Sequence, residues 1–219
     1  MALDAITGSG ASLSTNFYLR KFYTSNRAAR TASTRSSFKN SELSLADGMA
    51  LRRAIKSLGS FEYEKANDAD IRNGVLAYIS TYNNTISSLS KSDDRTLNRN
   101  MKQLKSLTEE YSHELDKIGI TINKDGTLTS RDSLFKSANL SKFEKLFSKD
   151  SDYMQKVSAY GKRIERCSEV LCYAERTAAL KPNTTAADDT TPVAELVAEA
   201  IDLDMLLNTG VGKNVNISL

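Results

Sequence analysis

The chain has 219 residues, of which 40% are hydrophobic, 7% aromatic and 26% charged, and its net charge at neutral pH is +3. This length suffices for one or two domains with a real core, whereas 2 prolines and 10 glycines are too few for an all-β sandwich built on regularly spaced tight turns. The sequence contains no run of about 18 apolar residues, so it predicts no transmembrane helix, and its first ten residues lack the basic and apolar regions of a Sec-type signal.

The two ends of the chain carry opposite charge. Residues 1–41 contain six bases and one acid, for a net charge of +5, and residues 182–219 contain six acids and one base, for a net charge of −5. Charges arranged in this way predict ends that attract each other, within one chain or between chains. The alternative interpretation is a solvated polar arm at each end.

In chain order, the first predicted segment is a basic, flexible arm over residues 1–40. Ser, Thr and Arg dominate it, and a segment of that composition gains little from ordering because it buries little apolar surface. Within it, residues 13–30 favour a helix that would carry Phe17, Phe22 and Tyr23. A firmer helix is predicted from near Ser41 to Gly59, because polar residues precede its apolar stripe and a glycine follows it.

Two long helices are predicted next. Residues 62–90 place apolar side chains at steps of three and four, which indicates a broad buried stripe. Residues 94–118 follow a turn and show a heptad pattern, which requires a partner helix.

The periodicity then changes from that of a helix to that of a strand. Residues 119–129 alternate apolar and polar side chains around Asp125-Gly126, which predicts a β-hairpin because Asp and Gly tolerate positive φ. Two short helices are expected within residues 130–148, and a long helix over residues 150–180. A linker predicted for residues 181–192 contains both prolines, and residues 193–219 are expected to form a short helix, over 193–207, and a mobile tail.

These elements predict a mainly α fold. Residues 41–180 are expected to form an elongated antiparallel helical bundle with one short β-hairpin at about 119–129. The side chains expected deepest in the core are Ile79, Tyr82, Ile86, Leu104, Tyr111, Ile118, Ile120, Leu128, Phe143, Phe147, Val157, Ile164 and Leu171.

Several motifs follow one another in a recognisable order between residues 70 and 180. They are the helical segment Val75–Ser90, the entry Leu115-Asp116-Lys117-Ile118-Gly119-Ile120, the turn Asp125-Gly126-Thr127-Leu128, and the pair Leu146-Phe147 before the long helix. In these motifs the chain resembles the C-terminal core of bacterial flagellar hook-associated protein 2, the filament cap protein. The resemblance implies a rod of helices that serves assembly. About 15 residues, from Leu58 to Arg72, stand where that family carries large β-rich outer domains, so it implies a shortened subunit.

The sequence lacks the short motifs of several common enzyme sites. HExxH, GxxxxGK[ST], GxGxxG and GxSxG do not occur, and the single histidine, His113, is predicted to face solvent. Residues 121–132 partly match a calcium loop, but a hairpin turn accounts for Gly126 without a metal. We therefore expect a protein that is not an enzyme, with no catalytic residue, metal, cofactor or small-molecule substrate.

The two cysteines are predicted to be structural. Cys167 and Cys172 point about 140° apart on one helix, so they cannot share a metal or form a disulfide while the helix holds. Cys167 lies with Tyr160 on the apolar stripe of the helix over 150–180. Cys172 lies off that stripe and is a candidate exposed thiol.

Three functional hypotheses follow from these patterns. The leading one is a structural assembly protein, a shortened flagellar cap-like subunit that self-associates through its helices. It would be exported without a Sec signal to an extracellular flagellum or the cell surface, and its partners would be itself or other flagellar-type axial proteins, not a membrane. The candidate assembly residues are Arg20, Lys21, Arg27 and Arg30 in the arm, and Leu196, Val197, Ile201 and Met205 in the last helix.

Two alternatives belong to other classes of protein. One is a cytoplasmic helical adaptor or export-chaperone-like protein, which the cysteines favour. The other binds nucleic acid through the basic arm, where Phe22, Tyr23 and Phe38 would stack on bases between the Arg and Lys side chains. The acidic C-terminal segment counts against nucleic acid.

Overall fold

The structure is a computed structural model, which describes residues 12–180; 72% of these residues are helical. The chain divides into two compact units, residues 1–169 and residues 170–219. Of the second unit, only the helical residues 170–180 are described. The predicted linker at 181–192, the helix at 193–207 and the tail lie outside the described residues.

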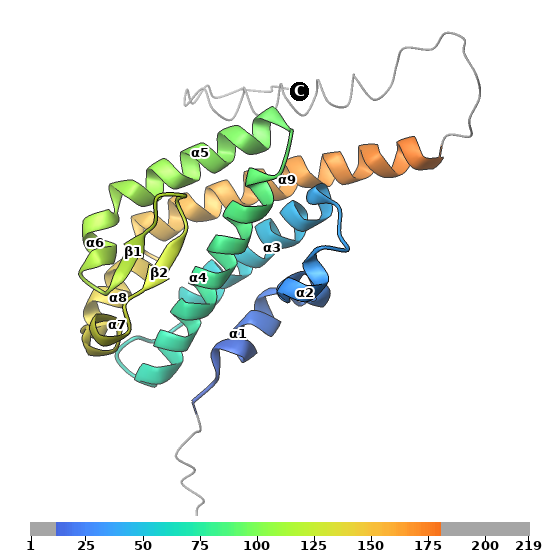
Figure 1. The fold of residues 1–219 in the computed structure, drawn as a ribbon. Helices are drawn as coiled ribbons and strands as arrows, with labels where there is room; N and C mark the ends of the chain where they lie inside the picture. Colours follow the sequence, from blue (N-terminus) through green and yellow to red (C-terminus); the bar gives the residue numbers. More distant parts are fainter. Residues whose placement is uncertain (1–11, 181–219) are drawn as a thin grey trace, which may run out of the picture. The chain divides into compact units, whose positions relative to one another are not determined.

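Helices account for nearly all the regular structure between residues 12 and 180 (Figure 1). In chain order the elements are α1 (Thr15–Phe22), the 3-10 helix η1 (Arg27–Arg30), α2 (Ala32–Arg35), α3 (Asn40–Leu58), α4 (Asp68–Ser90), α5 (Arg95–Glu110), α6 (Ser112–Asp116), β1 (Ile120–Ile122), β2 (Leu128–Ser130), α7 (Asp132–Ser137), α8 (Leu140–Phe147) and α9 (Asp152–Leu180). No helix in this part of the chain combines the length and the apolar character needed to cross a bilayer.

Four long helices, α3, α4, α5 and the part of α9 before residue 170, form an antiparallel bundle (Figure 1). The N-terminal half of α3 lies against the middle of α9 at Gly48 and Ile164, and the C-cap residue Gly59 lies against Lys149. The helix α5 also runs opposite to α9, because the Asp94 carboxylate at its start meets the Cys167 thiol late in α9, and the Tyr111 hydroxyl at its end donates to Asp152 at the start of α9. The predicted mainly α bundle is thereby confirmed.

Tyrosine and threonine hydroxyls meet in the centre of this bundle. The hydroxyl oxygens of Tyr78 and Tyr153 lie 3.1 Å apart, and the Tyr82 hydroxyl donates to the Thr108 hydroxyl at 3.1 Å. The Thr108 hydroxyl in turn lies 3.4 Å from the Tyr153 hydroxyl, so one chain of hydrogen bonds joins α4, α5 and α9. Each aromatic ring is fully buried, while its polar end has a partner.

The β-hairpin caps one side of the bundle through α4. Its two strands are antiparallel and pair Ile120 with Ser130 and Ile122 with Leu128. The Asn83 side chain of α4 accepts from the Leu128 amide at 2.7 Å and donates to the Leu128 carbonyl at 2.8 Å. This pair of hydrogen bonds attaches β2 to α4, and the hairpin predicted at 119–129 is confirmed.

The N-terminal segment differs from the predicted flexible arm. Residues 15–35 form α1, η1 and α2, and α1 packs on both α3 and α4. Tyr18, Phe22 and Tyr23 are at most 3% exposed. Composition suggested a segment that buries little, but aromatic side chains at helical spacing supply the apolar face that makes ordering favourable.

The predicted core is largely confirmed, and the departures from it are local. Tyr111 and Leu171 are half-buried, whereas the other eleven expected core residues are buried. The helix predicted over 94–118 breaks at Tyr111, where α5 ends and α6 begins. On α9, Gly161 and Ser168 are buried in place of the predicted Tyr160 and Cys167, which are half-buried. A straight helix repeats every 3.6 residues, so its buried face drifts away from a strict heptad.

Candidate functional site

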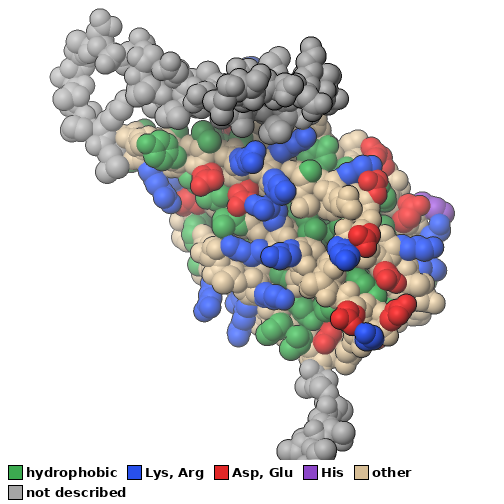
Figure 2. All heavy atoms as spheres, turned by 180° about the vertical axis from the view of Figure 1, so that it is seen from behind, with side chains coloured by type: hydrophobic (Ala, Val, Ile, Leu, Met, Phe, Trp, Pro, Cys, Tyr) green, Lys and Arg blue, Asp and Glu red, His purple; other side chains and the backbone are tan. Residues whose placement is uncertain are grey.

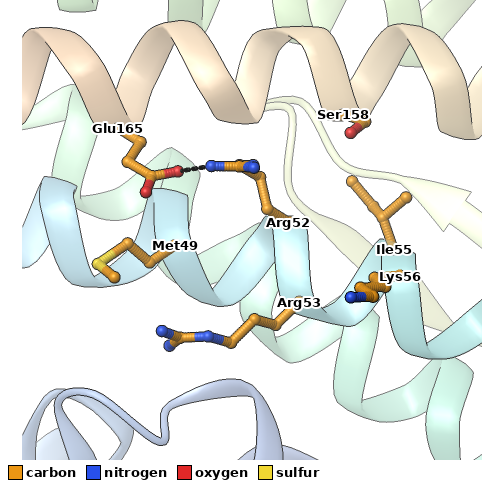
Figure 3. Close-up of a pocket in the computed structure, with 7 residues that line it drawn as sticks. All are labelled: Met49, Arg52, Arg53, Ile55, Lys56, Ser158 and Glu165. Atoms are coloured by element: carbon orange, nitrogen blue, oxygen red, sulfur yellow. Dashed lines mark hydrogen bonds and ion pairs between the residues drawn. The ribbon is translucent and has the colours of Figure 1, made fainter.

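One side of α3 carries three bases, of which Lys56 is exposed and Arg52 and Arg53 are half-buried. Met49, Arg52, Arg53 and Lys56 follow one another at helical spacing, so they share one side of the helix. Together with Ile55, Ser158 and Glu165 they line an open pocket of about 330 Å³ between α3 and α9 (Figure 3). The pocket is therefore built from two helices that are distant in sequence.

Close approach of α3 and α9 sets the geometry of this pocket. A Cβ atom on Gly48 would lie 3.1 Å from Ile164 Cγ2 and 3.2 Å from the Glu165 nitrogen, and one on Gly161 would lie 2.9 Å from Arg52 Cγ. Glycine at both positions lets the two helices come close enough for the Arg52 side chain to lie across Gly161. There the Arg52 guanidinium pairs with the Glu165 carboxylate (Figure 3).

At the edge of this pocket, Arg53 connects α3 to α1 and to the turn that follows it. The Arg53 guanidinium donates to the Phe22 carbonyl at 3.1 Å and to the Ser25 hydroxyl at 2.5 Å. Its positive charge thus lies at the C-terminal end of α1, where the helix dipole favours a cation. Lys21 of α1 donates to the Ser57 hydroxyl of α3 at 3.3 Å, which places a further base beside this face.

We call Lys21, Arg52, Arg53, Lys56 and Glu165 the α3 basic surface. Its four bases and one acid give a formal charge of +3. Among residues 12–169, no carboxylate forms an ion pair with Lys21, Arg53 or Lys56. On the face of the molecule drawn in Figure 2, Lys and Arg side chains gather towards one edge, and Asp and Glu side chains are more frequent towards the other edge. A surface of this charge is suited to an acidic partner.

The predicted assembly residues fall into two groups. Arg20, Lys21 and Arg27 are exposed, and Arg30 is half-buried, with its guanidinium donating to the Asn16 side-chain oxygen at 2.5 Å. Of these four, Lys21 has the hydrogen bond that brings it to α3. The remaining predicted residues, Leu196, Val197, Ile201 and Met205, lie outside the described part of the chain.

Arg52, Arg53 and Lys56 were not among the residues predicted from the sequence. A signal for them was present, because these bases interrupt the apolar pattern of the helix predicted from Ser41 to Gly59 at steps of three and four. Glu165 carried no signal of its own, since its partner Arg52 stands 113 positions away in the chain.

A second cluster of charged groups is buried and structural. Arg35 binds Asp47 through two hydrogen bonds of 2.9 and 2.7 Å, and the Asp47 side chain is 0% exposed. The Tyr23 hydroxyl also donates to Asp47, at 2.7 Å, and accepts from the Asn84 amide at 3.0 Å. Burial, followed by the charge of Asp47, raises the pKa of Tyr23 well above its usual value. The cluster ties the N-terminal segment to α3 and α4.

The other residues considered for chemistry are accounted for by local structure. His113 is exposed, as predicted, and Cys167 is half-buried on α9. Cys172 is 5% exposed, so the interpretation as an exposed thiol is wrong; the helix turns it onto the same side as buried Ser168. The Asp125 carboxylate accepts from the Thr127 hydroxyl and amide, which lowers the pKa of Asp125.

Neither these residues nor their neighbours assemble into a metal site. Within residues 12–180, no three His, Cys, Asp or Glu side chains come close enough together to hold a metal ion. Comparison of the chain with protein-family models, with curated proteins and with solved structures gives no match.

Proposed function

We propose that this chain is a structural assembly protein, a shortened flagellar cap-like subunit that acts by self-association. The observation that carries the proposal is the α3 basic surface on a well-packed helical unit, in a chain whose residues 182–219 have a net charge of −5. Copies of such a chain are electrostatically complementary to one another.

The resemblance to hook-associated protein 2 adds support at the level of packing. Its entry, turn and Leu-Phe motifs place Leu115, Ile118, Ile120, Leu128 and Phe147 among the buried side chains of α6, the hairpin and α8. The motifs are thus part of one packed cap on the bundle. An extracellular flagellum or cell-surface location, with other axial proteins as partners, belongs to the same proposal.

Deletion of residues 182–219 tests the proposal. We expect the intact chain to form oligomers at low salt and the deleted chain to stay folded while losing oligomer mass, as measured by light scattering and circular dichroism. Added salt should weaken assembly of the intact chain, because attraction between exposed charges is screened within about 10 Å at 0.1 M. An intact chain that is monomeric at low salt and high concentration would contradict the proposal and favour the adaptor alternative.

The burial pattern weighs against the nucleic-acid alternative in its predicted form. Phe22 is 0% exposed and Tyr23 is 1% exposed, so neither ring is available to stack on a base. Phe38 is half-buried. The exposed bases of the N-terminal segment remain, but the interleaved aromatic platform that motivated this hypothesis is part of the core.

A further inference from the structure

The α3 basic surface has the features of a docking surface rather than of a solvated helix face. Its side chains are held by the packed elements α1, α3 and α9 through the hydrogen bonds of Arg53 and Lys21 and the ion pair of Arg52. Arg52 is already compensated by Glu165, whereas no described carboxylate compensates the charges of Lys21, Arg53 and Lys56. An acidic partner would therefore gain attraction without displacing an existing ion pair of these three bases.

The sequence supplies an acidic segment with matching spacing. Glu195, Glu199 and Asp202 stand four and three residues apart, so the helix predicted over 193–207 would carry all three carboxylates on one face. On α3, Arg52 and Arg53 precede Lys56 by four and three residues. At about 1.5 Å of rise per residue, the one step from Arg53 to Lys56 and the two steps between the carboxylates each span about 4.5 to 6 Å along a helix axis, so the spacing of Arg53 and Lys56 matches that of two carboxylates.

We propose that the α3 basic surface of one copy docks the acidic face Glu195–Glu199–Asp202 of a second copy. This inference rests on the proposed self-association and names the two surfaces that carry it. The contact is heterologous, because each copy offers a basic surface to one neighbour and an acidic segment to another. Such contacts generate rings or open chains, which is what a structural subunit requires.

Lys21→Glu combined with Lys56→Glu in the full-length chain tests the docking surface. Both side chains are exposed, and the variant spares the hydrogen bonds of Arg53, so the fold should persist. We expect association at low salt to weaken by about tenfold or more, since reversed charges repel the acidic face. The matched control is Lys142→Glu with Lys145→Glu, which makes the same change of charge at exposed positions of α8 and should leave association unchanged.

Charge reversal on the acidic face identifies the occupant. Glu195→Lys with Glu199→Lys should weaken association of the full-length chain to a similar extent. An equimolar mixture of this variant with the Lys21→Glu, Lys56→Glu variant should recover oligomer mass in light scattering, because each reversed surface then meets an opposite charge on the other chain. No recovery on mixing would overturn docking between copies.

The remaining outcomes separate this inference from the proposed function. If deletion of residues 182–219 lowers oligomer mass but Lys21→Glu with Lys56→Glu does not, self-association stands and the docking surface is wrong. If neither change lowers the mass, both proposals fail. If the reversed surface leaves the mass unchanged but abolishes binding of a single-stranded oligonucleotide in fluorescence anisotropy, the surface serves nucleic acid and the inference is overturned.

Discussion

At the scale of single residues, the tyrosines of the bundle centre determine how the core responds to pH. Burial raises the pKa of Tyr78 and Tyr82, with a contribution from the neighbouring Tyr153, and burial raises the pKa of Tyr153 itself. A tyrosine in the unfolded chain titrates near pH 10. The folded state therefore holds these phenolic protons more tightly than the unfolded state does.

We expect the free energy of unfolding to fall above about pH 10. A raised pKa in the folded state contributes stability that is fully present below the unfolded pKa and is lost as the pH rises towards the folded value. The slope should approach about 1.4 kcal/mol per pH unit for each such tyrosine. Urea unfolding between neutral pH and strong alkali measures this slope. Tyr82→Phe should lower the slope by the contribution of one tyrosine. Equal slopes for the variant and the parent would show that Tyr82 titrates normally.

The buried Arg35–Asp47 ion pair is a second feature whose contribution to stability depends on single residues. With its side chain 0% exposed, Asp47 depends on Arg35 and Tyr23 for compensation of its charge. The pKa of Arg35 is raised, since hydrogen bonding to Asp47 and the charge of Asp47 outweigh the opposing effect of burial. Removing either partner would leave a buried charge without compensation, which is far more costly than losing an exposed ion pair.

At the scale of elements, two glycines define the hairpin. Gly119 precedes β1 with a φ of 76°, and Gly126 lies in the turn with a φ of 81°. Both are in the left-handed region that other residues adopt only with strain. Their surroundings differ, because a Cβ on Gly119 would stand 2.6 Å from the Phe135 nitrogen, whereas one on Gly126 would meet the methylene groups of the Lys105 side chain.

Gly119→Ala should therefore destabilise the protein more than Gly126→Ala. The change at Gly126 costs about 1–2 kcal/mol of backbone strain, since the Lys105 side chain can move aside. The change at Gly119 adds a clash with the backbone of α7 at Phe135, which cannot move without disturbing the buried Phe135 ring. Urea unfolding of both variants measures the difference, and equal losses would mean that the hairpin shifts freely against α7.

At the scale of the whole molecule, the N-terminal segment completes the core rather than extending from it. Phe22 and Ala29 are 0% exposed, and Arg35 crosses from α2 to the buried Asp47 of α3. The segment also places Lys21 on the α3 basic surface. Stability and the candidate docking surface therefore both depend on the N-terminal segment.

Removal of residues 1–39 should destabilise the protein by at least about 3 kcal/mol, because a buried carboxylate loses its partner and apolar surface becomes exposed. Urea unfolding and binding of a hydrophobic dye measure these effects. The control is Arg20→Ser with Arg27→Ser, which removes exposed charge but keeps the packed side chains and should unfold as the parent does. A truncated chain with an unchanged unfolding midpoint would show that residues 1–39 act only as an arm.

The local features of this protein could be predicted from its sequence, because they depend on neighbouring residues. Apolar side chains at steps of three and four identified α3, α4, α5 and α9, although the predicted helix over 62–90 began too early for α4 and the one over 94–118 ran past the end of α5. The change of period around Asp125-Gly126 identified the hairpin. Of the five residues of the α3 basic surface, only Lys21 was among the assembly residues predicted from the sequence.

Tertiary structure decided the packing of the N-terminal segment and the formation of the pocket. Periodicity shows which face of a helix is apolar, but it does not show which element covers that face. The composition of the N-terminal segment predicted a basic arm. In the structure Arg35 and Tyr23 bind Asp47, a carboxylate that helix periodicity does not mark as buried. The pocket likewise exists only because Gly48 and Gly161 let α3 and α9 approach closely, which brings Arg52 to a glutamate 113 positions away. Contacts over such separations depend on the packing of the whole chain, and no local pattern encodes them.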